Sequence, residues 1–240
     1  MFYANRVTDY ADIESNLLSS FKEKCYICEC KIGKDYEFDH RIPTFANKED
    51  KRLLENWNLF LSCGTCNKIK GVRFFQTSCE CKCGNGYLGI IDCTKCDPNK
   101  LISLCIDDEN TITITEKERT PCTEFTMHLL KMIYCGEPKE KMKIKKLANL
   151  IDSIGDQHSK CSDIVRKLKL RIKYNVLEDE INNLVDELVT TIRPDSPFSA
   201  FKRTYLEQMC ESAKNCTLKS KLKEALDRAD TERASTFDCI

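Results

Sequence analysis

Cysteine content is the feature of this sequence that most restricts what it can fold into. The chain of 240 residues contains 17 cysteines, about 7% of the total and an odd number. Such a content indicates either disulfides in an oxidising compartment or thiolates that bind metal in a reducing one. Residues 1–15 carry scattered charges and lack the apolar stretch of a signal peptide. We therefore expect a cytoplasmic protein whose reduced cysteines bind zinc or are buried as small apolar side chains.

The overall composition excludes several protein classes. With 41% hydrophobic residues, 32% charged residues, 8 Gly and 6 Pro, the chain is neither collagen-like nor of low complexity. No run approaches the roughly 18 uncharged apolar residues of a membrane span, so we expect no membrane role. Lys+Arg and Asp+Glu balance at 38 each. A nucleic-acid surface would therefore have to come from local segregation of charge.

Charge is segregated in this way in the second half of the chain. Residues 139–173 contain eleven Lys/Arg against four Asp/Glu, whereas residues 174–197 contain one against six. One interpretation is two solvated helix faces that pair with each other. The alternative is a phosphate-binding surface or a face that docks a partner protein.

The two halves of the chain differ in pattern. Ten of the cysteines precede residue 97, whereas apolar residues recur at helical spacing from about residue 123 onward. The periodicity predicts helices around 12–21, 147–154, 181–192 and 218–226, the second of them ending at Gly155. Alternating residues at 101–105 and 111–115 predict a β-hairpin. We therefore expect an α+β chain with a first domain at 1–120 and a mostly helical domain at 121–240.

Three cysteine pairs have the C-x-x-C spacing of zinc ligands, namely Cys25/Cys28, Cys63/Cys66 and Cys93/Cys96. About one such pair is expected by chance at this cysteine content, so the sequence between the pairs matters more. The first two pairs enclose YEFDHRIP at 36–43, and NWNLFLSCGTCNKIKG at 56–71 contains the second. One zinc ion on both pairs would join a short strand to a helix beginning at Asn67, in a segment too small for a core of its own.

Two residues of these runs offer hard oxygen ligands. The strand that begins near Tyr36 would carry Asp39 and His40 at its end. The Asp39 carboxylate and the Asn67 amide carbonyl suit Mg²⁺ or Mn²⁺, ions that keep several waters and accept a phosphate oxygen. The sequence therefore predicts a catalytic Mg²⁺ or Mn²⁺ ion beside a structural zinc.

The order Asp-His, Asn-Leu and Cys-x-x-Cys-Asn-x-x-Lys, over residues 25–71, resembles the motif of the HNH endonucleases, the ββα-metal nucleases. The resemblance implies a small zinc-stapled domain in which His40 is the general base. It implies that Asn58 orients the His40 ring and fixes the following loop, with Asn56 as the alternative. Asn67 stands where many members have His. Lys68 and Lys70 follow on the same helix and would meet phosphate.

A second cysteine cluster lies at 79–96 and could hold another zinc ion. Its expected ligands are Cys81, Cys83, Cys93 and Cys96, with Cys79 as an alternative to Cys81. The irregular spacing leaves open that these are surplus cysteines. The other cysteines, Cys30 among them, have no ligand pattern, and we expect His128 and His158 to be ordinary surface or core residues.

Residues 96–98, the helical tail and the run SPFSAFKR at 196–203 resemble the HNH subunit (PtuB) of Septu-type anti-phage systems, including those associated with retrons. The resemblance implies a nuclease effector bound to an ATPase subunit, with the helical half as docking domain and 178–192 as a candidate surface. We expect cleavage of DNA rather than RNA. The alternatives are cleavage of RNA such as tRNA by the same site, and a catalytically silent zinc module that binds nucleic acid or protein.

Overall fold

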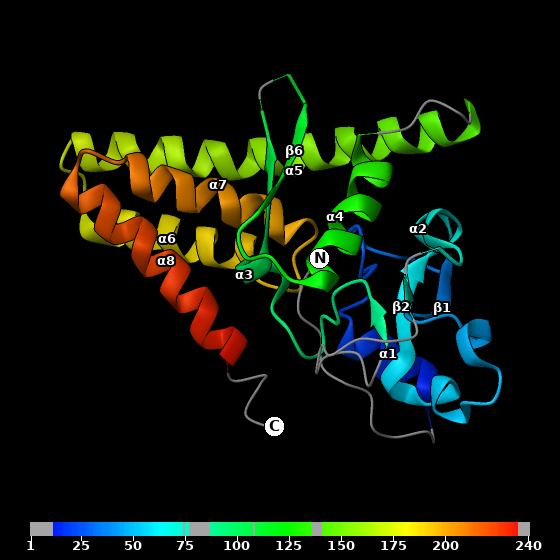
Figure 1. Cartoon of the computed structure of the whole chain (residues 1–240). Helices are drawn as coiled ribbons and strands as arrows, with labels where there is room; N and C mark the ends of the chain where they lie inside the picture. Colours follow the sequence, from blue (N-terminus) through cyan, green and yellow to red (C-terminus); the bar gives the residue numbers. More distant parts are fainter. Residues whose placement is uncertain (1–11, 74, 77–86, 108, 136–140, 235–240) are drawn as a thin grey trace. The chain divides into compact units, whose positions relative to one another are not determined.

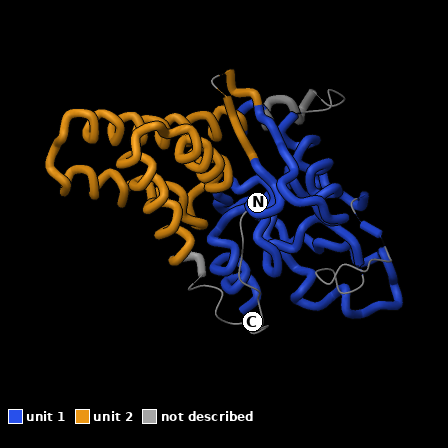
Figure 2. Tube along the Cα trace, turned by 60° about the vertical axis from the view of Figure 1, so that its left-hand side comes forward, with its two compact units in different colours: residues 1–103, 112–150 blue, residues 104–111, 151–240 orange. Residues whose placement is uncertain are grey.

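The structure is a computed structural model, and it describes residues 12–73, 75–76, 87–107, 109–135 and 141–234. The fold is mixed α+β, with several helices and small antiparallel sheets. The chain forms two compact units, shown in Figure 2: unit 1 comprises 1–103 and 112–150, and unit 2 comprises 104–111 and 151–240. No helix among the described residues is long and apolar enough to cross a membrane.

The elements are short in the first half of the chain and long in the second (Figure 1). The first half contains α1 (Ile13–Ser20), β1 (Tyr36–His40), the 3-10 helices η1 (Thr44–Asn47), η2 (Lys51–Leu54) and η3 (Asn56–Asn58), β2 (Leu59–Cys63), α2 (Gly64–Lys70), β3 (Phe75–Gln76), β4 (Leu88–Gly89), α3 (Pro98–Leu101), β5 (Ile102–Ile106) and β6 (Ile112–Glu116). The second half contains α4 (Pro121–Tyr134), α5 (Lys141–Lys173), α6 (Glu178–Ile192), α7 (Ser199–Ser212) and α8 (Cys216–Ala234).

The predicted N-terminal helix and hairpin are both confirmed. The Asp12 carboxylate caps α1 by accepting a hydrogen bond from the Ser15 backbone N–H at 3.2 Å. Strands β5 and β6 form a two-stranded sheet within one residue of the predicted bounds. Asp107 accepts hydrogen bonds from the backbone N–H groups of Glu109 and Thr111 in the connecting turn, which is the usual use of Asp there.

Strands β1 and β2 pair in antiparallel fashion beside α2 (Figure 1). The register sets Tyr36 opposite Cys63 and His40 opposite Leu59. Because side chains alternate along a strand, Glu37 and Asp39 share one face of β1 and His40 lies on the other. The hydrogen bonds described below show that the face with Asp39 is the one turned to α2.

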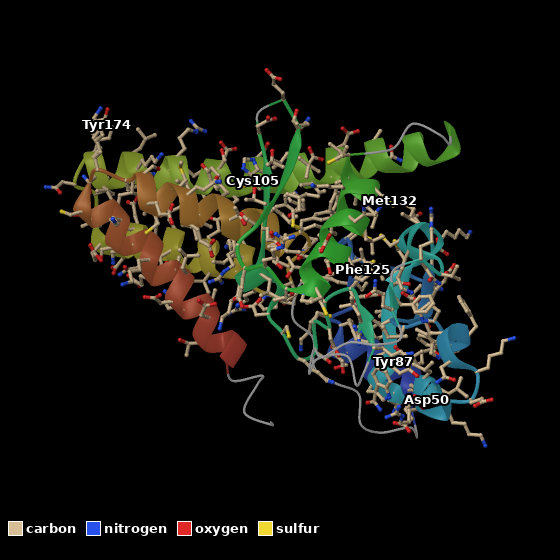
Figure 3. The ribbon with its side chains drawn as sticks, in the orientation of Figure 1. Asp50, Tyr87, Cys105, Phe125, Met132 and Tyr174 are labelled. Atoms are coloured by element: carbon tan, nitrogen blue, oxygen red, sulfur yellow. The ribbon has the colours of Figure 1, made fainter. Side chains whose placement is uncertain are left out.

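A small apolar cluster supports the connection between β1 and β2. Ile42, Leu53, Trp57 and Tyr87 are buried together, so the short helix η2 packs against the residue that precedes β4. The Tyr87 hydroxyl reaches back and donates a hydrogen bond to the Asp50 carboxylate at 2.7 Å (Figure 3). This cluster fixes the chain that follows His40.

Helix α4 belongs to unit 1. It begins after the cap residue Thr120, and it packs against α2, β4 and β6. The Tyr134 hydroxyl near its end donates a hydrogen bond to the carbonyl of Cys28 at 3.2 Å. The division into two domains at residue 120 stays a prediction. The contacts assign α4 to the same compact unit as the cysteine pairs.

Unit 2 is a bundle built from 151–173 of α5 and from α6, α7 and α8. The predicted amphipathic stripe of α6 is confirmed. Its buried residues are Ile181, Val185, Leu188, Val189 and Ile192. They join the core formed with α5, α7 and α8, so the chain itself covers the apolar face of 178–192, the segment expected above to be a candidate partner surface.

One predicted helix end is wrong, because α5 continues through Gly155 to Lys173. The buried residues Cys161, Ile164, Val165 and Leu168 extend the apolar stripe beyond the glycine. A Cβ atom at position 155 would lie 2.6 Å from Oδ1 of Asn110, so the glycine permits a close approach of the hairpin turn.

The acidic helix α6 pairs with basic residues of its own unit. Arg171 of α5 binds Glu180 at 3.0 Å. From α8, Arg228 binds Asp186 at 2.6 Å. Most of these side chains are exposed, so each pair contributes at most about 1 kcal/mol. These ion pairs favour the interpretation that the charged segments are solvated helix faces that pair with each other. One of the basic partners, Arg228, lies on α8 and outside the basic segment 139–173.

Candidate functional site

Cys25, Cys28, Cys63 and Cys66 form a cluster in which all four sulfur atoms lie within 4.8 Å of one another. The Sγ atoms of Cys28 and Cys63 are 3.9 Å apart. A tetrahedral zinc site with Zn–S bonds of about 2.3 Å places its sulfurs about 3.8 Å apart. The predicted grouping of these cysteines is therefore confirmed, and the cluster can hold a metal ion such as zinc.

Local backbone geometry presents these thiols. Cys25 and Cys28 lie in a tight loop where the Cys25 N–H donates to the carbonyl of Cys30 and Glu29 has a left-handed φ of 59°. Cys63 ends β2 and caps α2, its sulfur accepting from the Cys66 N–H at 3.4 Å. The neighbouring thiols, Cys25 first, hold the pKa of Cys63 below its usual range, which favours the thiolate that binds metal.

Cys30, predicted to be an ordinary thiol, lies at the edge of this cluster. Its Sγ is 3.2 Å from Sγ of Cys28, and its side chain is partly exposed. A structural zinc ion takes four ligands, a number that the four other cysteines can supply. Cys30 is therefore a fifth sulfur beside the site rather than a required ligand.

We expect the Cys30→Ser protein to retain one zinc ion per chain in this cluster, because all four ligands remain. Zinc content after gel filtration, measured by a colorimetric chelator assay, checks this result. A Cys28→Ser protein, prepared in parallel, should lose the ion. Equal losses from the two variants would show that Cys30 is itself a ligand.

Asp39 lies almost fully buried between β1 and α2. Its Oδ1 accepts a hydrogen bond from Nζ of Lys70 at 2.5 Å, and its Oδ2 accepts from the hydroxyl of Tyr26 at 2.6 Å. Burial raises the pKa of Asp39 above its usual value, and Lys70 and Tyr26 oppose that shift. The carboxylate is thus held in a fixed position by one cation and one phenol.

The position of Lys70 differs from the expectation that its side chain would contact phosphate. Only 2% of the residue is exposed. Besides Asp39, its ammonium binds the backbone carbonyl of His40 at 2.9 Å. Lys68, by contrast, is exposed on the same helix. The buried ammonium ties the end of β1 to α2.

Asn67 is the fourth residue of α2, because the helix begins at Gly64 and not at Asn67 as predicted. Its Nδ2 donates to Oε2 of Glu37 at 2.7 Å. A Cβ atom on Gly64 would lie 2.6 Å from the other oxygen of Glu37, so the glycine admits this carboxylate beside the helix. Glu37 is a neighbour of the candidate site that the sequence reasoning missed.

His40 ends β1 and is half-buried. Burial lowers the pKa of His40 below its ordinary value, and the Asp39 carboxylate opposes that shift. The imidazole is therefore neutral near pH 7. In that state one ring nitrogen carries a lone pair that can accept a proton.

Asn58 fixes the loop after His40, as the resemblance implied. Its side chain accepts from the Ile42 N–H at 2.7 Å and donates to the carbonyls of Ile42 and Leu53 at 2.7 and 2.8 Å. Both amide donors are committed to these carbonyls, so neither is left to orient the His40 ring. Asn58 positions His40 through the backbone.

We expect Asn58→Ala to lower the free energy of unfolding of unit 1 by about 3 kcal/mol, because three buried backbone groups lose their partners. Urea unfolding followed by tryptophan fluorescence measures the change, since Trp57 is the preceding residue and the single tryptophan. Lys48→Ala, at an exposed position in the same connection, should shift the midpoint little. Equal midpoints for wild type and Asn58→Ala would contradict this role.

The structure thus brings some predicted residues together and leaves others apart. Asp39 and Asn67 both face the contact between β1 and α2, yet each binds a different partner, so their role as Mg²⁺ or Mn²⁺ ligands stays a prediction. Cys81 and Cys83 lie outside the described residues, as does Cys79. In the described part of the chain, the four-cysteine cluster is the one group of His, Cys, Asp or Glu found with metal-site spacing.

Two sequence signals could have located the missed neighbours. Glu37 precedes Asp39 by two positions, so strand alternation alone places both on one face. Lys70 follows Asn67 by three positions, so helical spacing places both on the face turned to β1.

Comparison with protein-family models, curated proteins and solved structures found no match for this chain.

Proposed function

We propose that this chain is a metal-dependent HNH-type endonuclease that hydrolyses phosphodiester bonds in nucleic acid, DNA rather than RNA. The observation that carries the proposal is the position of His40 at the end of β1, with Asp39 beside it, on a hairpin that the four-cysteine cluster joins to the helix of Asn67. This is the order of parts that the resemblance implies. The zinc cluster supplies the scaffold, and the chemistry is assigned to the end of the strand.

In this proposal His40 accepts the proton of an attacking water molecule. The Asp39 carboxylate and the Asn67 carbonyl would hold a Mg²⁺ or Mn²⁺ ion, which supplies charge stabilisation at the phosphate and the leaving 3′ oxygen. The donor types fit such an ion, because each carboxylate oxygen offers a second lone pair beyond the one that Lys70 or Tyr26 uses. Asn58 keeps His40 in place through the Ile42 backbone.

Incubation of the full chain with supercoiled plasmid and with total tRNA tests this function. We expect plasmid cleavage with Mg²⁺ or Mn²⁺ and none with EDTA. Asn67→Ala should need a higher metal concentration for the same rate, because one proposed ligand is lost. Cleavage of tRNA alone would assign RNA as the substrate, and absence of metal-dependent cleavage of either polymer would contradict the proposal.

We further propose that the nuclease is the effector of a bacterial anti-phage complex that contains an ATPase. The support is the Septu-type resemblance of residues 96–98 and 196–203. The second run leads into α7, where Nζ of Lys202 donates to Oγ of Ser196 at 2.6 Å. Co-purification of an ATPase with the tagged chain from its native host, followed by a plaque assay with and without the nuclease, tests the role.

One observation favours the silent zinc module as a second candidate. Both oxygens of Asp39 already have donors, Lys70 and Tyr26, and a buried ion pair of this kind can be purely structural. A silent module would bind nucleic acid equally well with Mg²⁺ and without added divalent metal, and would leave it uncut. Comparison of cleavage with and without added Mg²⁺ or Mn²⁺ therefore separates the two candidate functions.

A further inference from the structure

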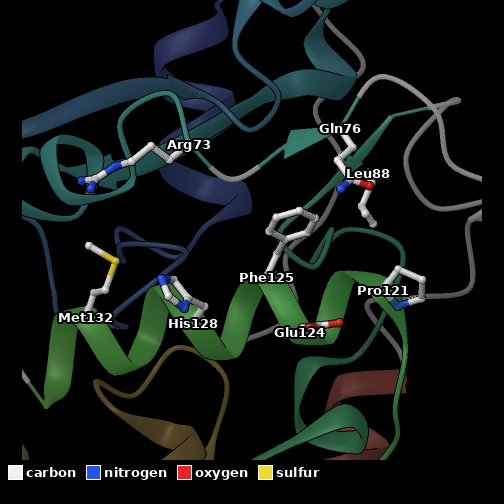
Figure 4. A pocket seen from close by; sticks show the side chains of 8 residues that line it. All are labelled: Arg73, Gln76, Leu88, Pro121, Glu124, Phe125, His128 and Met132. Atoms are coloured by element: carbon white, nitrogen blue, oxygen red, sulfur yellow. The ribbon is translucent and has the colours of Figure 1, made fainter.

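A cavity of about 590 Å³ lies in unit 1 between α4 and the segment that follows α2 (Figure 4). Pockets that hold small organic ligands have volumes of roughly 300–1,000 Å³ and combine apolar walls with a few polar groups. The walls here include Leu88 and Met132, and the polar lining includes Arg73, Gln76 and His128. The candidate catalytic site uses none of these residues.

The lining side chains are arranged by type along the cavity. Figure 4 shows Arg73 and His128 toward one end, the ring of Phe125 in the middle, and Glu124 and Gln76 toward the other end. His128 lies three positions after Phe125 and four after Glu124, so all three fall within roughly 100° of the surface of α4. The cavity therefore offers a cationic end, an aromatic wall and an end with an acidic and an amide group.

We propose that this cavity binds one nucleotide, with its phosphate at Arg73, its base on the ring of Phe125 and the base edge at Glu124. A guanidinium has five N–H donors, and within the described residues the Arg73 guanidinium donates to the carbonyl of Ile69 at 3.2 Å, which leaves donors for a phosphate. Any of the bases can stack on an aromatic ring, because every base has a π-face. A carboxylate accepts from an exocyclic amine such as N4 of cytosine and offers nothing to the carbonyl of uracil.

Helix α2 connects the cavity to the candidate catalytic residues. Nζ of Lys70 binds the carbonyl of His40 at 2.9 Å, and the Arg73 N–H lies 3.5 Å from the carbonyl of Lys70. Gly71 ends the helix between them with a positive φ of 48°. If the nucleotide belongs to the substrate strand, a reading that rests on the proposed function, the cavity holds an unpaired nucleotide near the cleaved bond.

Isothermal titration of the full-length, zinc-loaded His40→Ala protein tests the proposal without cleavage. The probes are dCMP, dUMP and deoxyribose 5-phosphate, followed by single-stranded d(C)₁₂ and its duplex with d(G)₁₂. We expect one site that binds dCMP about tenfold more tightly than dUMP and more tightly still than the sugar phosphate. We also expect d(C)₁₂ to compete with dCMP, and the duplex to compete less. Equal binding of dCMP and deoxyribose 5-phosphate would overturn the proposal.

Matched variants assign the contacts. Phe125→Leu keeps an apolar side chain without the ring, and Arg73→Gln removes the cation, so each should weaken dCMP binding about tenfold. Glu124→Gln should abolish the preference for dCMP over dUMP. Lys131→Gln, at an exposed position of α4 outside the cavity, is the control and should bind as wild type does. Unchanged binding by both Phe125→Leu and Arg73→Gln would overturn the proposal.

The test separates this inference from the proposed function. Wild-type protein that cleaves DNA but shows no dCMP binding contradicts the nucleotide cavity and leaves the nuclease intact. Protein that binds dCMP with the expected variant effects but cleaves neither polymer supports the cavity and contradicts the nuclease. Tighter binding of d(C)₁₂ than of dCMP assigns the nucleotide to a strand, and equal affinities assign it to a free mononucleotide.

Discussion

The Cys66→Ser protein is expected to lose its zinc ion and, with it, the folded structure of the hairpin and α2. Cys66 is buried in the first turn of α2, where its sulfur faces the loop of Cys25 and Cys28. Binding of a structural zinc ion supplies about 10–16 kcal/mol in small zinc domains. This exceeds the whole stability of many domains, about 5–15 kcal/mol. Loss of any one of the four cysteines should therefore have the largest effect on the stability of unit 1, and Cys66→Ser represents this group.

Zinc content and thermal unfolding of purified protein measure this effect. Cys216→Ser is the matched control, because Cys216 is exposed and lies in unit 2. The helical circular dichroism of α5 to α8 should persist in Cys66→Ser, since the core of unit 2 contains none of the four zinc cysteines. One zinc ion per chain and an unchanged midpoint in Cys66→Ser would contradict the zinc scaffold.

The His40→Ala protein is expected to cleave plasmid about 10²–10⁴-fold more slowly than wild type, the range that general-base groups contribute. The side chain is half-buried at the end of β1, whereas the Lys70 contact is made by its backbone carbonyl. Removal of the imidazole should therefore leave the fold and the zinc content intact. Loss of rate without loss of structure is the signature of a chemical role.

Initial rates of plasmid nicking under saturating Mg²⁺ measure the effect. His158→Ala is the control, because His158 lies in unit 2. Its ring packs edge-on against Tyr205, with the two ring centroids 4.7 Å apart. This control should cleave at the wild-type rate. Cleavage by His40→Ala at the same rate as His158→Ala would exclude His40 as the general base.

The parts of the structure that could be predicted from the sequence depend on the local spacing of residues along the chain. Helix α6 follows from apolar residues at a period of 3.6, and the four-cysteine cluster follows from paired spacing and the motif between the pairs. The end of α5 was missed because glycine stops a helix only where nothing else holds it, and the apolar stripe continues beyond Gly155.

The unexpected features of the candidate site come from contacts between distant residues. Lys70 reads as a surface lysine in sequence, yet it lies buried against Asp39, 31 positions earlier. Tyr26 reaches the same carboxylate from the loop of the first cysteine pair. Helical spacing alone puts Lys70 on the face of Asn67, but the ion pair with Asp39 depends on how the strand, the helix and the loop pack together. The same holds for the nearness of Cys30 to the zinc cysteines.

The sulfur cluster also decides where this protein can be lengthened. Cys28 and Cys63 meet although they are 35 positions apart, and a metal ion bound by both would close the intervening chain into a loop. Lengthening such a loop costs little, about 0.6 kcal/mol for each doubling. Lys48 and Glu49 are exposed in this loop, outside the buried residues that support His40. A peptide inserted between them would give an internal attachment point for a fluorescent reporter close to the candidate catalytic strand.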